Sequence, residues 1–219
     1  MFTGLVDNTG IVRSFSLRNG SGELVIETDR PYEHLQYGES IAVNGCCLTL
    51  EKELSPTHLV FHTLEETLRR TNLAQSSIRV NLERAMMLGG RMGGHIVSGH
   101  IDGVGCLRAV RPAGSDYELE VSLPAGLGDF LVEKGSIAID GISLTLIDVW
   151  PDSFTVQIIP VTWKETALSH RKIGDSVNLE TDLIGKYVVK MMRSAGNFQS
   201  TPRTSAITME KLAEAGFLD

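Results

Sequence analysis

The sequence SIAVNGCCLTL at residues 40–50 recurs as SIAIDGISLTL at residues 136–146, with seven identities in eleven positions at an offset of 96. Three other blocks repeat at nearly the same offset. FTGLVDNTG from residue 2 matches VSGHIDGVG from residue 97, TLRRTNL from residue 67 matches TWKETAL from residue 162, and VNLE occurs at residues 80 and 177. Four matched blocks in the same order indicate a tandem duplication of one structural unit.

Each half of the duplication has the pattern of β structure. Residues 22–29 (GELVIETD) and 153–159 (SFTVQII) are short and rich in β-branched and aromatic residues, and turn residues recur every 8–12 positions or so. Residues 65–73 and 161–168 each predict one short helix between strands. Because closure removes the exposed edges of such short strands, the sequence favours an all-β fold with two small antiparallel barrels.

The repeat length defines the expected domains. A period of about 96 residues is too long for one unit of a solenoid and suits a complete small domain. We therefore predict one barrel at residues 1–90, a second at 91–184, and a C-terminal helix and tail at 185–219. Residues 88–94 (LGGRMGG) predict a link, since they contain neither of the glycine motifs that bind phosphate.

The C-terminal residues change character. Apolar residues recur at helical spacing over residues 183–193 (LIGKYVVKMMR). This stripe predicts a helix that either packs on a barrel or associates with copies of itself in an oligomer. Residues 208–216 predict a second, capped helix.

Charge and composition exclude several classes of partner. The chain has 219 residues, with 20 Lys and Arg against 27 Asp and Glu, for a net charge of −7. We therefore expect no binding to nucleic acid and no basic anchor for a membrane. The first ten residues do not resemble a signal peptide, and two of the three cysteines are adjacent. These features predict a cytoplasmic protein without a disulfide framework.

Two matched pairs of small polar residues are candidates for chemistry. Cys47 and Thr49 correspond to Ser143 and Thr145, and residues i and i+2 of a strand face the same side. The glycine before each pair, in NGCCL and DGISL, predicts a close backbone approach where a flat ligand could reach main-chain groups. The alternative is that both pairs are satisfied inside the barrel wall.

The unmatched positions indicate a division of labour between the halves. The correspondences are Phe2 with Val97, Leu5 with His100, Cys47 with Ser143, and Ala85 with Asp182. Among these positions, the titratable His and Asp occur only in the second half. Two related pockets with unequal groups would bind one molecule twice and treat its copies differently. No metal site is predicted, because His95 and His100 lack ligand spacing. A nucleophilic pair of Cys47 with His100 stays open.

Six blocks in order carry a family resemblance: MFTG, NGCCLTL, ETLRRTNL, VNLERA, GGHIVSGHIDG and DGISLTL. The chain resembles riboflavin synthases of the α-chain type over residues 1–190. The resemblance implies two six-stranded antiparallel barrels of Greek-key type, each holding one lumazine. It also implies a homotrimer formed through the helix at residues 183–192, and leaves open an association with lumazine synthase.

The implied activity is a cofactor-free and metal-free transferase reaction, the last step of riboflavin biosynthesis. Two molecules of 6,7-dimethyl-8-ribityllumazine become riboflavin and 5-amino-6-(D-ribitylamino)uracil as a four-carbon unit moves between them. The alternative is a non-catalytic antenna or carrier protein that binds lumazine or flavin. A flavin-binding barrel of a reductase would require a nicotinamide domain, and none is expected in this sequence.

The resemblance also implies which residues form the site, position by position along the matching blocks. The implied catalytic set is Phe2, Cys47, His100, Ser143 and Asp182. The site of the N-terminal barrel would comprise Gly4, Leu5, Val6, Cys47, Leu48, Thr49, His62, Thr63, Leu64, Glu65, Glu66 and Thr67. The site of the C-terminal barrel would comprise Gly99, His100, Ile101, Lys134, Ser143, Leu144, Thr145, Gln157, Ile158, Ile159, Pro160, Val161 and Thr162. Val161 and Trp163 depart from the family pattern and are expected to alter the wall of that second pocket.

Overall fold

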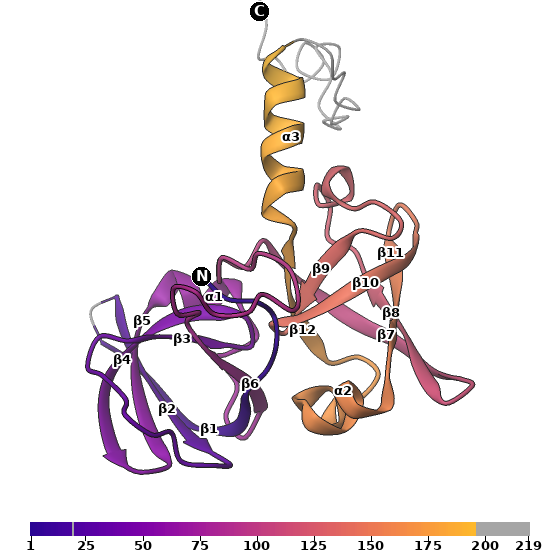
Figure 1. The fold of residues 1–219 in the computed structure, drawn as a ribbon. Coiled ribbons are helices and arrows are strands. Elements are labelled where there is room, and N and C mark those ends of the chain that lie inside the picture. The colour runs from indigo at the N-terminus through magenta and orange to yellow at the C-terminus, as the bar shows by residue number, and fades with distance from the viewer. Residues whose placement is uncertain (19, 196–219) are drawn as a thin grey trace, which may run out of the picture. The chain divides into compact units, whose positions relative to one another are not determined.

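The computed structural model describes residues 1–18 and 20–195 and contains two closed barrels of six antiparallel strands each (Figure 1). The first barrel comprises β1 (Asn8–Arg18), β2 (Ser21–Thr28), β3 (Ser40–Val43), β4 (Cys46–Ser55), β5 (His58–Leu64) and β6 (Arg79–Arg84). The second comprises β7 (Gly103–Ala113), β8 (Asp116–Ser122), β9 (Ser136–Ile139), β10 (Ile142–Val149), β11 (Ser153–Ile158) and β12 (Ser176–Thr181). The predicted all-β tandem fold is confirmed.

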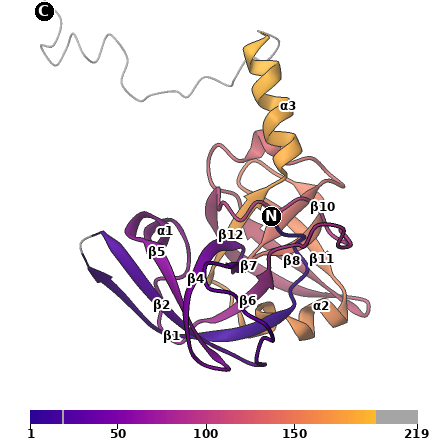
Figure 2. The same ribbon diagram turned by 60° about the vertical axis from the view of Figure 1, so that its left-hand side comes forward.

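The two barrels share one topology. Around the first barrel the neighbours run β1-β2-β5-β4-β3-β6, and adding six to each number gives the order of the second. Figure 2 separates the strands of the first barrel, drawn in indigo and violet, in a turned view. The sequence repeat is therefore a repeat of complete barrels.

Alternating side chains fill each barrel. Along β2 every second residue is buried, as expected for a strand with one face on a core. In the first barrel Leu24, Ile26 and Phe61 belong to one buried cluster. In the second barrel Leu119, Val121 and Phe154 occupy the corresponding interior. Each half thus has its own hydrophobic core.

The polar pairs face outward from these barrels. On β4 Cys46 and Leu48 are buried, whereas Cys47 is half-buried and Thr49 is exposed. On β10 Ser143 is likewise half-buried and Thr145 is exposed. The interpretation that these pairs lie inside the barrel wall is therefore wrong.

Tight hairpins explain the glycines before the pairs. Asn44 and Gly45 both have positive φ, at 45° and 77°, and Asp140 and Gly141 repeat this at 45° and 79°. Such values define two-residue turns for which Asn-Gly and Asp-Gly are favoured. A Cβ on Gly45 would lie 2.8 Å from the backbone N of Gly141. The predicted close approach is real, but the approaching group is the other hairpin and not a ligand.

Buried amides join the barrels around this contact. The carboxylate of Asp140, 1% exposed, accepts hydrogen bonds from Asn72 Nδ2 at 2.9 Å and from the backbone N of Asn178 at 2.8 Å. Arg171 donates to its other oxygen through two nitrogens, at 2.8 and 3.1 Å. Asn178 Nδ2 donates to the carbonyl of Asn44 at 2.9 Å. Burial raises the pKa of Asp140, while Arg171 and these donors oppose that shift.

The helices are short except at the C-terminus. α1 (Glu65–Arg70) and α2 (Pro160–Glu165) follow β5 and β11, a 3₁₀ turn at Ala167–His170 follows α2, and another lies at Gly128–Phe130. Both predicted short helices are present, and residues 88–94 contain neither helix nor strand. In residues 1–18 and 20–195 no helix has the length and apolar character needed to cross a bilayer.

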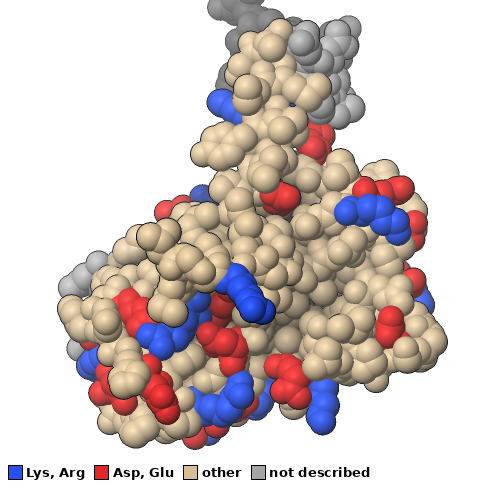
Figure 3. Space-filling view, in the orientation of Figure 1, with Lys and Arg blue, Asp and Glu red and all other residues tan. Residues whose placement is uncertain are grey.

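The predicted stripe forms α3 (Leu183–Ser194). Its apolar side chains at Ile184, Tyr187, Val188, Met191 and Met192 are 41–70% exposed. The helix predicted at residues 208–216 lies outside the described residues. On the face shown in Figure 3, acidic and basic side chains are interspersed over the barrels.

Candidate active site

Two short segments, one in each half of the chain, each contact the barrel of the other half. Residues 2 and 97 form an antiparallel bridge, in which Phe2 N donates to Val97 O at 2.8 Å and Val97 N donates to Phe2 O at 3.1 Å. Phe2 and Val97 are each 1% exposed and pack with Ala42 and Ala138. The chain that follows each bridging residue then crosses to the barrel of the other half.

Two buried carboxylates hold the crossing segments. Glu83 accepts hydrogen bonds from Thr3 N, Thr3 Oγ1 and Gly4 N at 2.6, 2.7 and 3.0 Å. Glu180 repeats the arrangement with the backbone and hydroxyl of Ser98 and the backbone of Gly99. Burial raises the pKa of Glu83, and its hydrogen bonds act against that shift.

The crossing glycines then contact the polar pairs. Gly4 O accepts from Ser143 N at 2.8 Å, and Gly99 O accepts from Cys47 N at 2.8 Å. A Cβ on Gly4 would lie 2.6 Å from Ser143 Cβ, and one on Gly99 would lie 2.5 Å from Cys47 Cβ. Both glycines also have positive φ, so these positions favour glycine for two reasons.

The first pocket lies at β4 and α1 and has a volume of about 280 Å³. Its lining residues come from the first barrel and from the segment after Gly99: Cys46, Cys47, Leu64, Glu66, Thr67, Arg70, Thr71, Gly99, His100 and Ile101. Burial raises the pKa of the Cys46 thiol to about 12. Cys47, its half-buried neighbour, therefore supplies the more accessible sulfur of this pocket.

The second pocket lies at β10 and α2 and has a volume of about 180 Å³. Its lining residues come from the second barrel and from the N-terminal segment: Gly4, Leu5, Val6, Ile142, Ser143, Val161, Thr162, Glu165 and Thr166. Each pocket thus combines one barrel with a segment of the other half.

This exchange corrects the sequence-based grouping. The resemblance implies that Gly4, Leu5 and Val6 belong to the site of the N-terminal barrel, but they line the pocket that contains Ser143. It implies that Gly99, His100 and Ile101 belong to the site of the C-terminal barrel, but they line the pocket that contains Cys47. The reason is the Phe2–Val97 bridge, because it directs each segment onto the opposite barrel.

His95 is the functional candidate that the sequence reasoning missed. Its Nδ1 lies 2.7 Å from Ser143 Oγ, and the two atoms form a hydrogen bond. Its other ring nitrogen is buried without a partner. Desolvation lowers the pKa of His95, while the charges of Asp182 and Glu180 act in the opposite direction. The environment of this half-buried ring therefore favours its neutral form.

Asp182 directly precedes α3. Its Oδ1 accepts a hydrogen bond from the backbone N of Ile184 at 2.9 Å, and its side chain is half-buried. Its negative charge acts on His95. The structure thus brings His95 to Ser143, with the charge of Asp182 acting on His95, whereas His100 lines the pocket of Cys47. His95 is the first His of the motif GGHIVSGH, and its proximity to Ser143 in space, rather than a local sequence pattern, marks its role.

Known proteins share the duplicated organisation of this chain. The lumazine binding domain matches the chain twice, at residues 3–85 and 98–182. A riboflavin synthase of Actinobacillus pleuropneumoniae is 40% identical over 219 residues, covering 99% of this chain and 100% of that protein. The chain belongs to the riboflavin synthase family. The riboflavin synthase of Bacillus subtilis is 37% identical with the same coverage, and that of Mycobacterium bovis is 41% identical over 90% of this chain.

Solved structures share the fold of this riboflavin synthase family member. LumP complexed with 6,7-dimethyl-8-(1'-D-ribityl) lumazine has a TM-score of 0.71 at 22% identity, and LumP complexed with riboflavin has 0.72 at 23%. Both matches cover 83% of this chain and 99% of LumP. They establish the tandem barrel architecture.

Several residues implied by the riboflavin synthase resemblance lie outside the two linings. Phe2 is buried between the barrels. Lys134 has a φ of 64° in the turn before β9, and its backbone N donates to Leu146 O. His62 lies beside a third hollow, with Ser21 and Glu23. The others are Leu48, Thr49, Thr63, Glu65, Leu144, Thr145, Gln157, Ile158, Ile159, Pro160 and Asp182.

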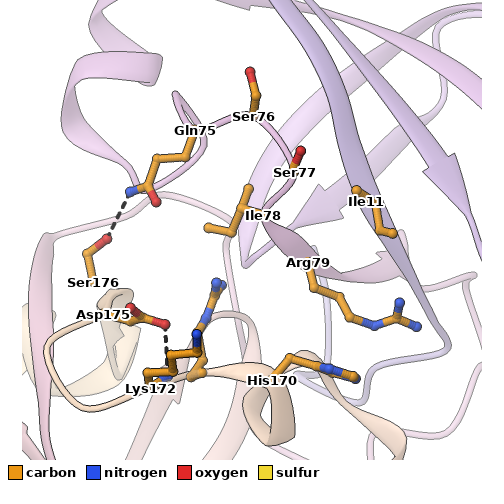
Figure 4. A pocket seen from close by; sticks show the side chains of 11 residues that line it. Ile11, Gln75, Ser76, Ser77, Ile78, Arg79, His170, Lys172, Asp175 and Ser176 are labelled. Carbon is orange, nitrogen blue, oxygen red and sulfur yellow. Dashed lines mark hydrogen bonds between the residues drawn. The ribbon is translucent and has the colours of Figure 1, made fainter.

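A larger hollow of about 480 Å³ lies apart from the groups assigned to riboflavin synthase chemistry (Figure 4). Figure 4 shows two hydrogen bonds among the residues that line this hollow. Gln75 donates to the hydroxyl of Ser176, and the backbone N of Lys172 donates to the carboxylate of Asp175. Arg79, on its wall, pairs with Asp29. Two hydrogen bonds thus join polar residues of its lining, and it contains neither Cys47 nor Ser143.

Proposed function

We propose that this chain catalyses the riboflavin synthase reaction, in which two molecules of 6,7-dimethyl-8-ribityllumazine give one riboflavin and one 5-amino-6-(D-ribitylamino)uracil. The observation that carries this function is identity of 34–41% to riboflavin synthases over nearly the whole chain. The chain is thus a transferase of riboflavin biosynthesis. A non-catalytic carrier is not favoured, because full-length relatives of synthase type match at this level.

The duplicated fold suits a reaction between two copies of one substrate. A four-carbon unit leaves one lumazine and joins the other, so the two products together contain all the atoms of the two substrates. Each pocket would hold one copy. Cys47 and His100 would face the first copy, and Ser143, backed by His95 and Asp182, would face the second.

Proton transfer is the chemistry that the second pocket supports. Loss of a proton from the C7 methyl group of lumazine gives a carbon nucleophile, which attacks the other copy. A neutral His95, hydrogen-bonded to Ser143, is suited to accept that proton through the hydroxyl. The negative charge of Asp182 would stabilise the protonated ring. In the first pocket Cys47 and His100 would position the acceptor copy or a nucleophile that adds to its C7.

Each pocket alone is too small to enclose a ligand completely. Their volumes, about 180 and 280 Å³, fall below the roughly 300–1,000 Å³ of pockets that enclose a drug-sized ligand. We propose a homotrimer in which the first pocket of one copy faces the second pocket of a neighbour. Holding two reactants in contact in this way supplies up to about 7–11 kcal/mol in the best-oriented cases. The exposed apolar face of α3 supports self-association.

The remaining assignments belong to the same proposal. Residues 1–90 and 91–184 would be the two lumazine-binding domains, and residues 185–219 would serve assembly. Phe2 would order the interface between substrates, and Lys134 and the exposed threonines Thr49 and Thr145 would contact the ligand once a neighbour covers it. A cytoplasmic location and an association with lumazine synthase complete the proposal.

The experiment compares variants of Ser143, which lines the second pocket, and of Asp182, whose charge acts on His95. Ser143→Ala and Asp182→Ala should lower riboflavin formation by about 100-fold or more, the range of a lost acid or base, while lumazine binding changes little. Ser115→Ala, in an exposed turn between β7 and β8, is the control and should keep full activity. Folded Ser143→Ala and Asp182→Ala proteins with wild-type turnover would refute the assigned roles.

A further inference from the structure

The helices beside the two pockets are equivalent by register. α1 and α2 each contain six residues and follow equivalent strands. Thr71 Oγ1 donates to Thr67 O at 2.8 Å, and Thr166 Oγ1 donates to Thr162 O at 2.7 Å. An offset of 95 therefore relates every residue of one helix to a residue of the other.

The first helix is anchored in a barrel core. Leu68 is 3% exposed and belongs to the buried cluster of the first barrel. Beneath it lies Gly22 on β2, where a Cβ would lie 2.8 Å from Thr63 Cγ2 and 3.3 Å from Leu68 Cδ1. Leu68 thus packs directly over a backbone that has no room for a side chain.

The second helix is anchored differently at the same register. Tyr117 pairs with Ile158 across β8 and β11, as Gly22 pairs with Thr63 across β2 and β5. Trp163 takes the position of Leu68 and stacks on Tyr117, with ring centroids 4.6 Å apart and an interplanar angle of 21°. Both rings are half-buried. The stacked pair of Trp163 and Tyr117 therefore occupies the positions that Leu68 and Gly22 occupy in the first half.

The stack bears on the second pocket through α2. A helix of six residues has little stability of its own, so tertiary contacts fix its position. Val161, Thr162, Glu165 and Thr166 line the pocket, whereas Trp163 itself is absent from the lining. We propose that Trp163, stacked on Tyr117, is a positioning residue that sets the wall of the second pocket and so the affinity for the ring system bound there.

Binding of riboflavin tests this proposal directly. The chain has two tryptophans, so Trp150→Phe leaves Trp163 as the single reporter on α2. In that background Tyr117→Ala should change the emission of Trp163 and raise the riboflavin Kd, read from quenching of that emission, by about 2- to 10-fold, the range expected for one aromatic pair. Tyr117→Phe should restore both. Leu68→Ala, which alters the first helix, should leave this Kd unchanged.

Steady-state kinetics provides the second readout. Tyr117→Ala, and Trp163→Leu, which copies the first half, should raise the KM for lumazine more than they lower kcat, because they weaken substrate binding. The kinetic prediction depends on the proposed reaction, whereas the equilibrium prediction does not. Wild-type protein without turnover would refute the reaction alone. A Tyr117→Ala protein with altered Trp163 emission but Kd and KM unchanged would overturn the positioning role, as would failure of Tyr117→Phe to restore affinity.

Discussion

Substitution of Gly99 by alanine tests the exchange of segments that forms the first pocket. The new Cβ would lie 2.5 Å from Cys47 Cβ and 2.9 Å from Phe2 Cε2, and both neighbours belong to the packed region between the barrels. The backbone has a φ of 87° at this position. The substitution therefore introduces left-handed strain and overpacking together.

A control separates the two effects. Gly114, in the turn between β7 and β8, has a φ of 66° and no atom within 4 Å of an added Cβ. Both variants pay the left-handed cost of about 1–2 kcal/mol, but only Gly99→Ala adds overpacking, which costs about 1–3 kcal/mol. Urea unfolding should therefore show Gly99→Ala to be less stable than Gly114→Ala by about 1–3 kcal/mol.

Gly99→Ala and Gly114→Ala should also differ in their rate of riboflavin formation. His100 and Ile101 directly follow Gly99 and line the pocket of Cys47, and a displacement near 1 Å at a reacting site can cost about 100-fold in rate. Gly99→Ala should thus lose most riboflavin formation under conditions where it remains folded, and Gly114→Ala should keep it. Equal stability and equal turnover of the two variants would refute the close packing of Gly99 on Cys47.

Three further predictions concern buried charge, pH and assembly. Arg171→Met leaves the Asp140 carboxylate unpaired and should cost about 3–5 kcal/mol in urea unfolding; adding Asp140→Asn should recover most of that loss, and a double variant no more stable than the single would contradict the pairing. The pKa of His95 is lowered in the folded state from 6.5, so its contribution to stability is present above pH 6.5 and is lost as pH falls toward the folded value. The free energy of unfolding of His95→Gln should therefore change less between pH 5.5 and 7.5 than that of wild type, and an equal change would exclude a lowered pKa of His95. Met191→Glu on the exposed face of α3 should dissociate the proposed trimer in sedimentation and abolish riboflavin formation, whereas an intact, active trimer would place the interface elsewhere.

The repeat made the fold predictable from sequence. SIAVNGCCLTL and SIAIDGISLTL are β3-β4 and β9-β10, and their alternation places Cys47 and Ser143 on the outer face at equivalent positions. Strand composition and turn spacing then sufficed for two closed barrels. Local pattern was informative because β2 and the first residues of β4 and β10 bury alternate side chains in the core of their own barrel.

Tertiary features were beyond the sequence pattern. The bridge between Phe2 and Val97 exchanges two segments, and no local periodicity reports which barrel a crossing segment reaches. The role of His95 depends on the same crossing, since it brings the ring to Ser143 over 48 residues of chain. The glycines of NGCCL and DGISL predict a close approach but not the group that approaches. A hairpin turn that packs on its own repeat requires glycine just as a contact with a ligand would.

The most direct test of the proposed reaction is product stoichiometry. Purified protein, without added cofactor or metal, is incubated with 6,7-dimethyl-8-ribityllumazine as the single substrate, and both products are quantified by chromatography. The account predicts one riboflavin and one 5-amino-6-(D-ribitylamino)uracil for every two lumazines consumed. Tight binding of lumazine without formation of either product would contradict it.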